Sequence, residues 1–166
     1  MKKTLLSLLT LVLAVIMCLG LSGCGTLKQL ENEYGALIEG GGFKKGSTLN
    51  LNEIPVTEET ANEVLEQLAK SGISIDDESK AYIYDIFVTN KKNEEVQPDG
   101  TVKVTIPAPA DEKAEGYNVY HIKDSGAVEN IPATLANGKI TFETDGFSTY
   151  ILVPSTTSTP TTGIQR

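Results

Sequence analysis

The chain has 166 residues and a formal net charge of −8, with 22 acidic side chains against 14 Lys and Arg. This balance disfavours binding to nucleic acids and to anionic lipid headgroups, because both attract patches of Lys and Arg. The length suits one domain with flanking segments.

Residues 1–23 have the layout of a secretory leader. Lys2 and Lys3 supply a positive start, and the run from Leu5 to Leu19 is apolar apart from two hydroxyl residues. A transmembrane helix needs about 20 apolar residues in succession, and small residues interrupt the run before that length is reached. The sequence therefore predicts a signal peptide over residues 1–23.

A cysteine preceded by small residues follows the apolar run. The tetrad Leu21-Ser22-Gly23-Cys24 resembles the lipobox of bacterial lipoproteins. The resemblance implies diacylglyceryl transfer to Cys24, cleavage between Gly23 and Cys24, and anchoring at the extracytoplasmic face of the cell membrane. The alternative is an ordinary signal peptide whose cleavage leaves Cys24 as a free thiol.

Cleavage would leave Cys24 as the single cysteine of the exported chain, because Cys18 departs with the leader. An extracytoplasmic compartment permits disulfides, but one cysteine forms neither an intramolecular disulfide nor a cysteine-based metal site. Loss of Lys2 and Lys3 with the leader makes the net charge about −10.

Residues 24–44 are expected to form a lipid-anchored tether. Gly35 and the glycines at 40–42 interrupt its periodicity, so a short helix and a flexible spacer both remain open. A first strand is predicted from Phe43 to Ile54, where leucines alternate with asparagines. The loose helical spacing of the tether rests on five side chains: Leu27, Leu30, Tyr34, Leu37 and Ile38.

One amphipathic helix is predicted at about residues 58–71. Thr57 is placed to cap its N-terminus, and Gly72 follows where a C-terminal cap belongs. We expect its apolar stripe to cover the chain's own sheet, as surface helices usually do; a docking face for a partner is the alternative. The stripe consists of Ala61, Val64, Leu65, Leu68 and Ala69.

From residue 81 onward the apolar pattern changes to the period of two that is typical of strands. The strongest hairpin signal is Asn137-Gly138, because a type I′ turn needs positive φ at both positions. Short strands separated by turns predict a mainly β domain at 45–153, an antiparallel Ig-like β-sandwich with one inserted helix. Residues 154–166 are rich in Ser, Thr and Pro and are expected to be a disordered tail. The predicted strands are 81–89, 101–106, 117–123, 128–135, 139–144 and 147–153.

Three segments together resemble a β-sandwich module found in Gram-positive surface proteins, often close to an anchor. They are Tyr84 to Pro107, Val119 to Gly126, and Ile140 to Tyr150, and the resemblance covers roughly Phe43 to Val153. It implies an extracellular, non-catalytic module with no catalytic residues to carry over. Such modules usually lie within long chains, whereas here one module is nearly the whole exported protein, which argues against a simple spacer.

No residue pattern predicts a catalytic, cofactor or metal site. His121 is the single histidine and has no nucleophile motif near it, so we expect it to pack or form a hydrogen bond within its strand. Ser148 lacks the Gly-x-Ser-x-Gly setting of a hydrolase and is expected to be a corner or strand hydroxyl. Acidic clusters at 76–78 and 111–112 lack the spacing of a calcium-binding loop.

The predicted function is that of a non-enzymatic, lipid-anchored cell-surface protein, a binding or adhesion module of the envelope. Its predicted partners are the membrane, through diacylglyceryl on Cys24, and a cell-wall glycan or surface protein, but not nucleic acid. The alternative is a structural or accessory subunit of a membrane or cell-wall complex, docked through the helix stripe. Burial of that stripe in the monomer would argue against such docking.

Overall fold

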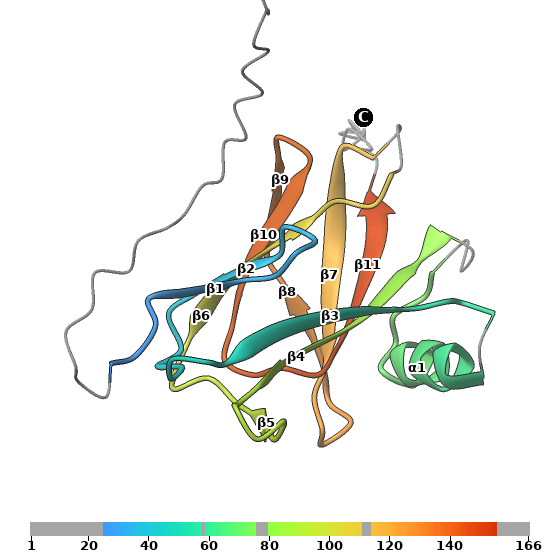
Figure 1. Cartoon of the computed structure of the whole chain (residues 1–166). Coiled ribbons are helices and arrows are strands. Elements are labelled where there is room, and N and C mark those ends of the chain that lie inside the picture. Colours follow the sequence, from blue (N-terminus) through green and yellow to red (C-terminus); the bar gives the residue numbers. More distant parts are fainter. Residues whose placement is uncertain (1–24, 58, 76–79, 111–113, 156–166) are drawn as a thin grey trace, which may run out of the picture.

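A computed structural model describes residues 25–57, 59–75, 80–110 and 114–155. Over these residues the chain is mainly β, with two antiparallel sheets and one short helix (Figure 1). Side chains from both sheets share one apolar core, which gives a β-sandwich-like architecture. The predicted mainly β class is thereby confirmed.

The first sheet has five strands in the order β1-β2-β6-β10-β9. In β6, Val102 and Val104 are buried while Lys103 between them is exposed, so the predicted alternation turns one face of the strand to the core. The bounds of its strands are β1 Gln29–Glu31, β2 Leu37–Glu39, β6 Val102–Pro107, β10 Lys139–Thr144 and β9 Ala133–Ala136.

The second sheet has six strands, in the order β3-β4-β11-β7-β8, with β5 paired to β4. β11 lies at its centre, and Tyr150, Ile151 and Leu152 are all 0% exposed because both faces of the strand are covered. The bounds are β3 Thr48–Ile54, β4 Tyr82–Thr89, β11 Thr149–Ser155, β7 Gly116–Ile122, β8 Val128–Ile131 and β5 Glu95–Val96.

Residues 128–135, predicted as one strand, form parts of two strands that belong to different sheets. The chain leaves β8 at Pro132 and enters β9, which pairs with β10. Proline cannot donate a hydrogen bond to a strand ladder, so it marks the point where the chain changes sheets. The predicted hairpin turn after β9 is confirmed, since Asn137 and Gly138 have φ of 52° and 70°.

Helix α1 (Glu59–Lys70) occupies the predicted region and ends as expected at a glycine. Gly72 has a φ of 79°, and the backbone N–H of Ile73 donates to the carbonyl of Leu68 at 3.1 Å. This closure satisfies carbonyls at the end of the helix that have no partner within it.

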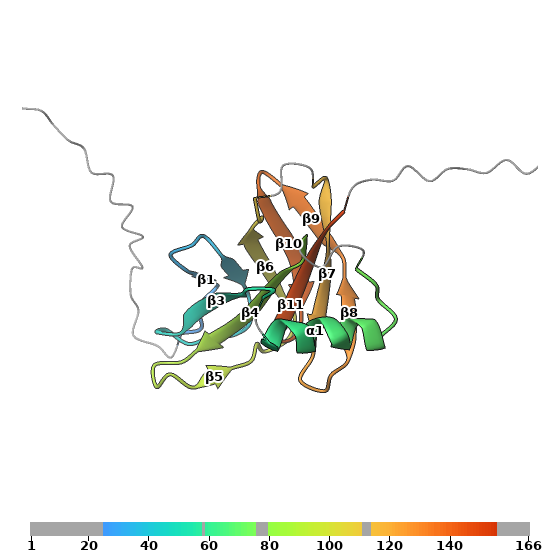
Figure 2. The same cartoon turned by 90° about the vertical axis from the view of Figure 1, so that its right-hand side faces the viewer.

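The apolar stripe of α1 packs against the outer face of the second sheet. Leu65 and Leu68 are 8% and 1% exposed, and they belong to one cluster with Ile83 of β4 and Ile151 of β11; Val64 is half-buried at its edge. Figure 2 shows the helix lying across this sheet. Most of the predicted stripe is therefore core, as expected, and not a free docking face, whereas Ala69 at its end is exposed.

Residues 25–44 form part of the sandwich where the sequence suggested a tether. β1 and β2 make a hairpin in which Leu30 pairs with Ile38, and β2 continues the sheet through β6. Leu30, Ile38 and Phe43 are buried in the main core. The described domain therefore begins at residue 25 instead of residue 45.

The hairpin explains why these residues resemble a broken helix. The Asn32 side-chain oxygen accepts hydrogen bonds from the backbone N–H groups of Tyr34 and Ala36, and Gly35 takes a φ of 82°. Gly35 thus forms a turn between strands that are too short to show a period of two. Leu30 and Ile38, the paired residues that are both buried, lie eight positions apart, a separation that also fits one face of a helix.

Several expectations fall on residues outside the described ranges. These are the signal peptide at 1–23, the lipidation and cleavage site at Gly23 and Cys24, and most of the tail, at 156–166. The first two residues of the predicted tail, Pro154 and Ser155, still pair with β7 as the end of β11. Within the described ranges, no helix has the length and apolar character needed to span a membrane.

Candidate functional site

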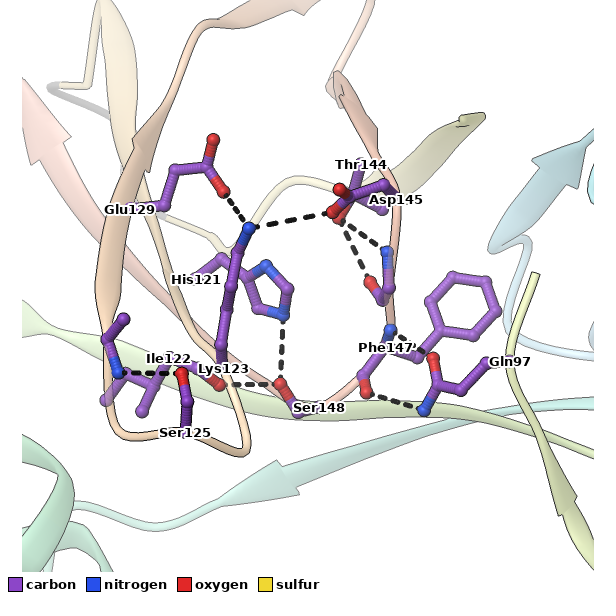
Figure 3. A network of polar contacts seen from close by, with 12 residues as sticks. Gln97, His121, Ile122, Lys123, Ser125, Glu129, Thr144, Asp145, Phe147 and Ser148 are labelled. Carbon is purple, nitrogen blue, oxygen red and sulfur yellow. Dashed lines mark hydrogen bonds and ion pairs between the residues drawn. The ribbon is translucent and has the colours of Figure 1, made fainter. Parts of the chain in front are cut away.

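A polar cluster lies where the chain passes from β10 in the first sheet to β11 in the second (Figure 3). Gln97 stabilises this connection between the sheets. Its side chain accepts a hydrogen bond from the Phe147 backbone N–H at 2.8 Å and donates one to the Phe147 carbonyl at 3.1 Å. Both backbone groups of Phe147 are satisfied although this residue belongs to no strand. The Phe147 ring stacks on Phe43, with 6.0 Å between ring centroids.

Tyr150 closes the same crossing from inside the core. Its hydroxyl donates to the Gly146 carbonyl at 2.5 Å and lies 2.9 Å from the Thr144 hydroxyl. Burial raises the pKa of Tyr150 above the ordinary value of 10.0, so the hydroxyl keeps its proton and remains a donor. Tyr150 therefore holds the corner in place and does not act as a titrating group.

His121 and Ser148 meet at the floor of this cluster. His121 Nε2 lies 2.9 Å from Ser148 Oγ, a distance at which a histidine base could accept a proton from a serine nucleophile. The two residues come together because Tyr150 of β11 pairs with His121 of β7, which sets the preceding corner beside the imidazole.

The direction of the hydrogen bonds argues against a nucleophile and base. Ser148 Oγ donates its single proton to the carbonyl of Ile122 at 2.6 Å. We therefore assign the proton of the His121–Ser148 contact to Nε2 of the imidazole, with Ser148 as acceptor. A base must accept the hydroxyl proton, so this pair has the opposite polarity and serves to join β7 to the corner.

His121 is held as a neutral ring. It is 2% exposed, it stacks on Tyr150 with centroids 4.4 Å apart, and its Nδ1 has no hydrogen-bond partner among the described residues. Burial lowers the pKa of His121 below 6.5, and the nearby Lys123 ammonium lowers it further, against the raising effect of three neighbouring carboxylates. The ring thus favours the uncharged state with a bare Nδ1.

An exposed ion-pair group covers the cluster. Lys123 Nζ lies 2.9 Å from a Glu129 carboxylate oxygen and 3.7 Å from Asp145 (Figure 3). Beside it is a shallow hollow of about 230 Å³, lined by His121, Lys123, Asp124, Asp145 and other corner residues. Charges of both signs line the hollow, so they select no ligand of either charge.

The sequence supported a separate expectation for His121 and for Ser148, and nothing in it predicted their contact. Each individual expectation agrees with the structure, because His121 packs and forms a hydrogen bond and Ser148 is a corner hydroxyl. Their pairing depends on the register between β7 and β11, for which the sequence holds no local signal. The acidic clusters at 76–78 and 111–112 lie outside the described residues; in the part the structure covers, no three His, Cys, Asp or Glu side chains are grouped to hold a metal ion.

Replacement of His121 by glutamine is expected to remove one contribution to the pH dependence of the free energy of unfolding. Because the folded-state pKa is below 6.5, the unfolded chain takes up the proton first as the pH falls. His121 thus contributes a loss of stability below about pH 6.5, whereas burial of Asp85, which raises its pKa, contributes the opposite trend at lower pH. Urea unfolding of wild type and His121→Gln from pH 7.5 to 5 isolates the histidine contribution, since Asp85 is common to both. If the free energies of unfolding of the two proteins changed in parallel with pH, the result would contradict a neutral, buried imidazole.

Comparisons with known proteins found no matching family, no matching curated protein and no matching solved structure.

Proposed function

We propose that this chain is a non-enzymatic, lipid-anchored module of a Gram-positive cell surface, held at the extracytoplasmic face of the membrane by diacylglyceryl on Cys24. The observation that carries the proposal is that the described sheet contacts begin only two residues after Cys24, at Thr26. Thr26 forms an isolated bridge with Lys44, and the Leu27 N–H donates to the Phe43 carbonyl at 2.6 Å. Cleavage between Gly23 and Cys24 would remove the apolar leader and keep every strand that the structure describes, whereas a cut a few residues later would remove these contacts.

Within this proposal the sandwich is Ig-like. Tyr150 lies near the start of β11, and its hydroxyl bonds back to Gly146 in the corner where the chain changes sheets. This contact resembles the tyrosine corner of Ig-like sandwiches, in which a tyrosine hydroxyl bonds to backbone a few residues upstream. It supports the kinship with extracellular modules that the sequence suggested.

The non-enzymatic role has support from the His121–Ser148 pair. Its hydroxyl proton is committed to a backbone carbonyl, so the pair offers no activated nucleophile. A subunit that docks through α1 is less favoured, because Leu65 and Leu68 are buried against the second sheet. We place binding at exposed loops instead, for example at Tyr34 in the β1–β2 turn, which is 68% exposed.

Expression of wild type and Cys24→Ala in a Gram-positive host tests the anchor. We expect the wild-type chain to begin at Cys24 and to carry the mass of a diacylglyceryl group, and the variant to carry none. Intact-mass measurement on protein extracted from membranes gives the answer directly. A wild-type chain without lipid mass would overturn the anchor.

The binding role is tested with the same lipidated protein. Retention on purified cell-wall fragments, or on a glycan array, supports a surface-binding module. If the folded protein binds neither the cell-wall fragments nor the glycan array, the result counts against that role and leaves the result for the anchor unaffected.

A further inference from the structure

A positively charged hollow lies at the end of the second sheet where the described chain begins. It measures about 440 Å³, and we call it the lysine hollow. Four lysines line it, Lys44, Lys45, Lys91 and Lys92, against a single carboxylate, Glu94. In a chain with a net charge of −8, this is a local reversal of sign.

The strand register brings these lysines together. β3 and β4 are antiparallel, and Thr48, the first residue of β3, pairs with Thr89, the last residue of β4. The loop before β3 and the loop after β4 therefore emerge at the same end of the sheet. One loop carries Lys44 and Lys45 and the other carries Lys91 and Lys92, so two separate lysine pairs become one surface.

Hydrogen bonds hold both loops in shape. Asn90 Oδ1 accepts from the backbone N–H groups of Lys92 at 2.8 Å and Glu94 at 3.1 Å, and Asn93 takes a φ of 61°. The side chain of Lys91 lies across Gly46, where a Cβ atom would collide with it. The lysine hollow is thus a built surface, with two loops packed against each other.

The four ammonium groups have no acidic partners in the described part of the chain. Three lysines elsewhere form ion pairs: Lys70 with Glu66, Lys103 with Glu39, and Lys123 with Glu129. None of the four lysines of the hollow forms such a pair, and the Glu94 carboxylate accepts a hydrogen bond from Asn90 at 2.8 Å. Unneutralised like charges gathered in one place attract an anionic ligand.

The position of the anchor identifies that ligand. Gly25 itself lines the lysine hollow, and its covalent neighbour Cys24 is one Cα–Cα step of about 3.8 Å away. Figures 1 and 2 show the start of the described chain at the same end of the molecule as the loop between β4 and β5. Acyl chains on Cys24 would therefore enter the bilayer directly beside the four ammonium groups.

We propose that the lysine hollow is a membrane-contact site that binds the phosphate groups of anionic lipids around the anchor. This inference rests on the proposed lipid anchor at Cys24. With Thr26 already bridged to Lys44, the domain has almost no linker, so anchoring turns this end of the sandwich toward the headgroups. The overall acidity of the chain does not prevent this contact, because the positive charge is segregated at the end that faces the bilayer.

Chemical acetylation of lysine side chains tests the proposal without any mutation. The lipidated full chain is reconstituted in vesicles of phosphatidylcholine alone, or of phosphatidylcholine with phosphatidylglycerol, and labelling is followed by mass spectrometry. We expect labelling of the four hollow lysines to slow about fivefold or more in anionic vesicles, since each lysine near an anionic surface gains about that factor in binding. Lys139 is exposed in β10 and serves as the internal control, with equal labelling in both vesicles.

Two further arms sharpen the test. Salt at 1 M shortens the screening length to about 3 Å and should abolish the protection. In a Lys91→Gln/Lys92→Gln variant, Lys44 and Lys45 should lose most of their protection, whereas Lys139→Gln should leave it unchanged. Equal labelling of the wild-type hollow in both vesicles would overturn the proposal. Protection by glycerol 3-phosphate in neutral vesicles would also overturn it and reassign the hollow to a soluble phosphate.

The anchor and the hollow can fail separately. Intact mass, measured before reconstitution, shows whether Cys24 carries lipid, and its absence defeats the anchor alone. The same labelling, with vesicles added to the unlipidated chain, then tests the hollow: slower labelling in anionic vesicles supports lipid binding, and equal labelling overturns it.

Discussion

Replacement of Ile38 by alanine is expected to lower the free energy of unfolding by about 2–5 kcal/mol, the range for a buried isoleucine truncated to alanine. Ile38 is 0% exposed and pairs with Leu30 on one side and Val104 on the other. Truncation leaves a cavity in the first sheet that the surrounding strands fill only partly. Urea unfolding of the purified chain measures the loss.

Tyr34→Ala is the matched control, because residue 34 lies in the turn of the same hairpin and is 68% exposed. Its truncation should change stability by less than about 0.5 kcal/mol. If Ile38→Ala were equally mild, the β1–β2 hairpin would not be part of the folding unit. A fragment starting at residue 45 is expected to be compromised for the same reason, since it lacks Leu30, Ile38 and Phe43.

Leu68→Ala is the second substitution with a large expected effect, again about 2–5 kcal/mol of unfolding free energy. Leu68 is 1% exposed and packs in one cluster with Ile83 and Ile151, which face each other across β4 and β11. The loss should appear in monomeric protein at any concentration, because both sides of the contact belong to one chain. Unfolding at two protein concentrations, together with size-exclusion chromatography, measures it.

Glu66→Ala is the control on the same helix. Glu66 is exposed and forms an ion pair with Lys70 one turn later, at 3.3 Å. Such pairs contribute about 0.3–0.5 kcal/mol, so this variant should stay close to wild type. A mild effect of Leu68→Ala on the monomer would instead indicate that the stripe is available for a partner.

The packing of residues 25–44 into the sandwich changes how the proposed anchor would act. A long flexible linker would let the sandwich turn freely above the bilayer, and the orientation of its charges would then be unimportant. Because Gly25 lines the lysine hollow and Thr26 is bridged to Lys44, the proposed anchor at Cys24 would be held close to the domain. One end of the sandwich would then meet the lipid surface, and the other end would be left for the proposed partner.

Much of the fold followed from the sequence because its causes are local. The alternation at Val102 and Val104 sets the buried face of β6, and Asn137-Gly138 adopts the positive φ that its hairpin needs. Gly72 ends α1 because glycine tolerates the left-handed conformation of the cap. Each feature depends on residues within a few positions of one another, where spacing in sequence fixes spacing in three dimensions.

The tertiary structure decided what depends on pairing between distant segments. The β1–β2 hairpin is stable only because β6 and the core cover it, so its three-residue strands carry no readable period. The break at Pro132 places β8 and β9 in different sheets, although they read as one strand.

The two clusters that bear on function have the same origin. His121 meets Ser148 through the register of β7 with β11, and two lysine pairs more than forty residues apart meet through the register of β3 with β4. The sequence by itself predicted a leader and a lipid-attachment motif, and it determined a mainly β class and a net charge. Only the tertiary structure decided where the lysines lie relative to the proposed anchor, because a strand register is selected by the burial of whole sheet faces and not by any short stretch of residues.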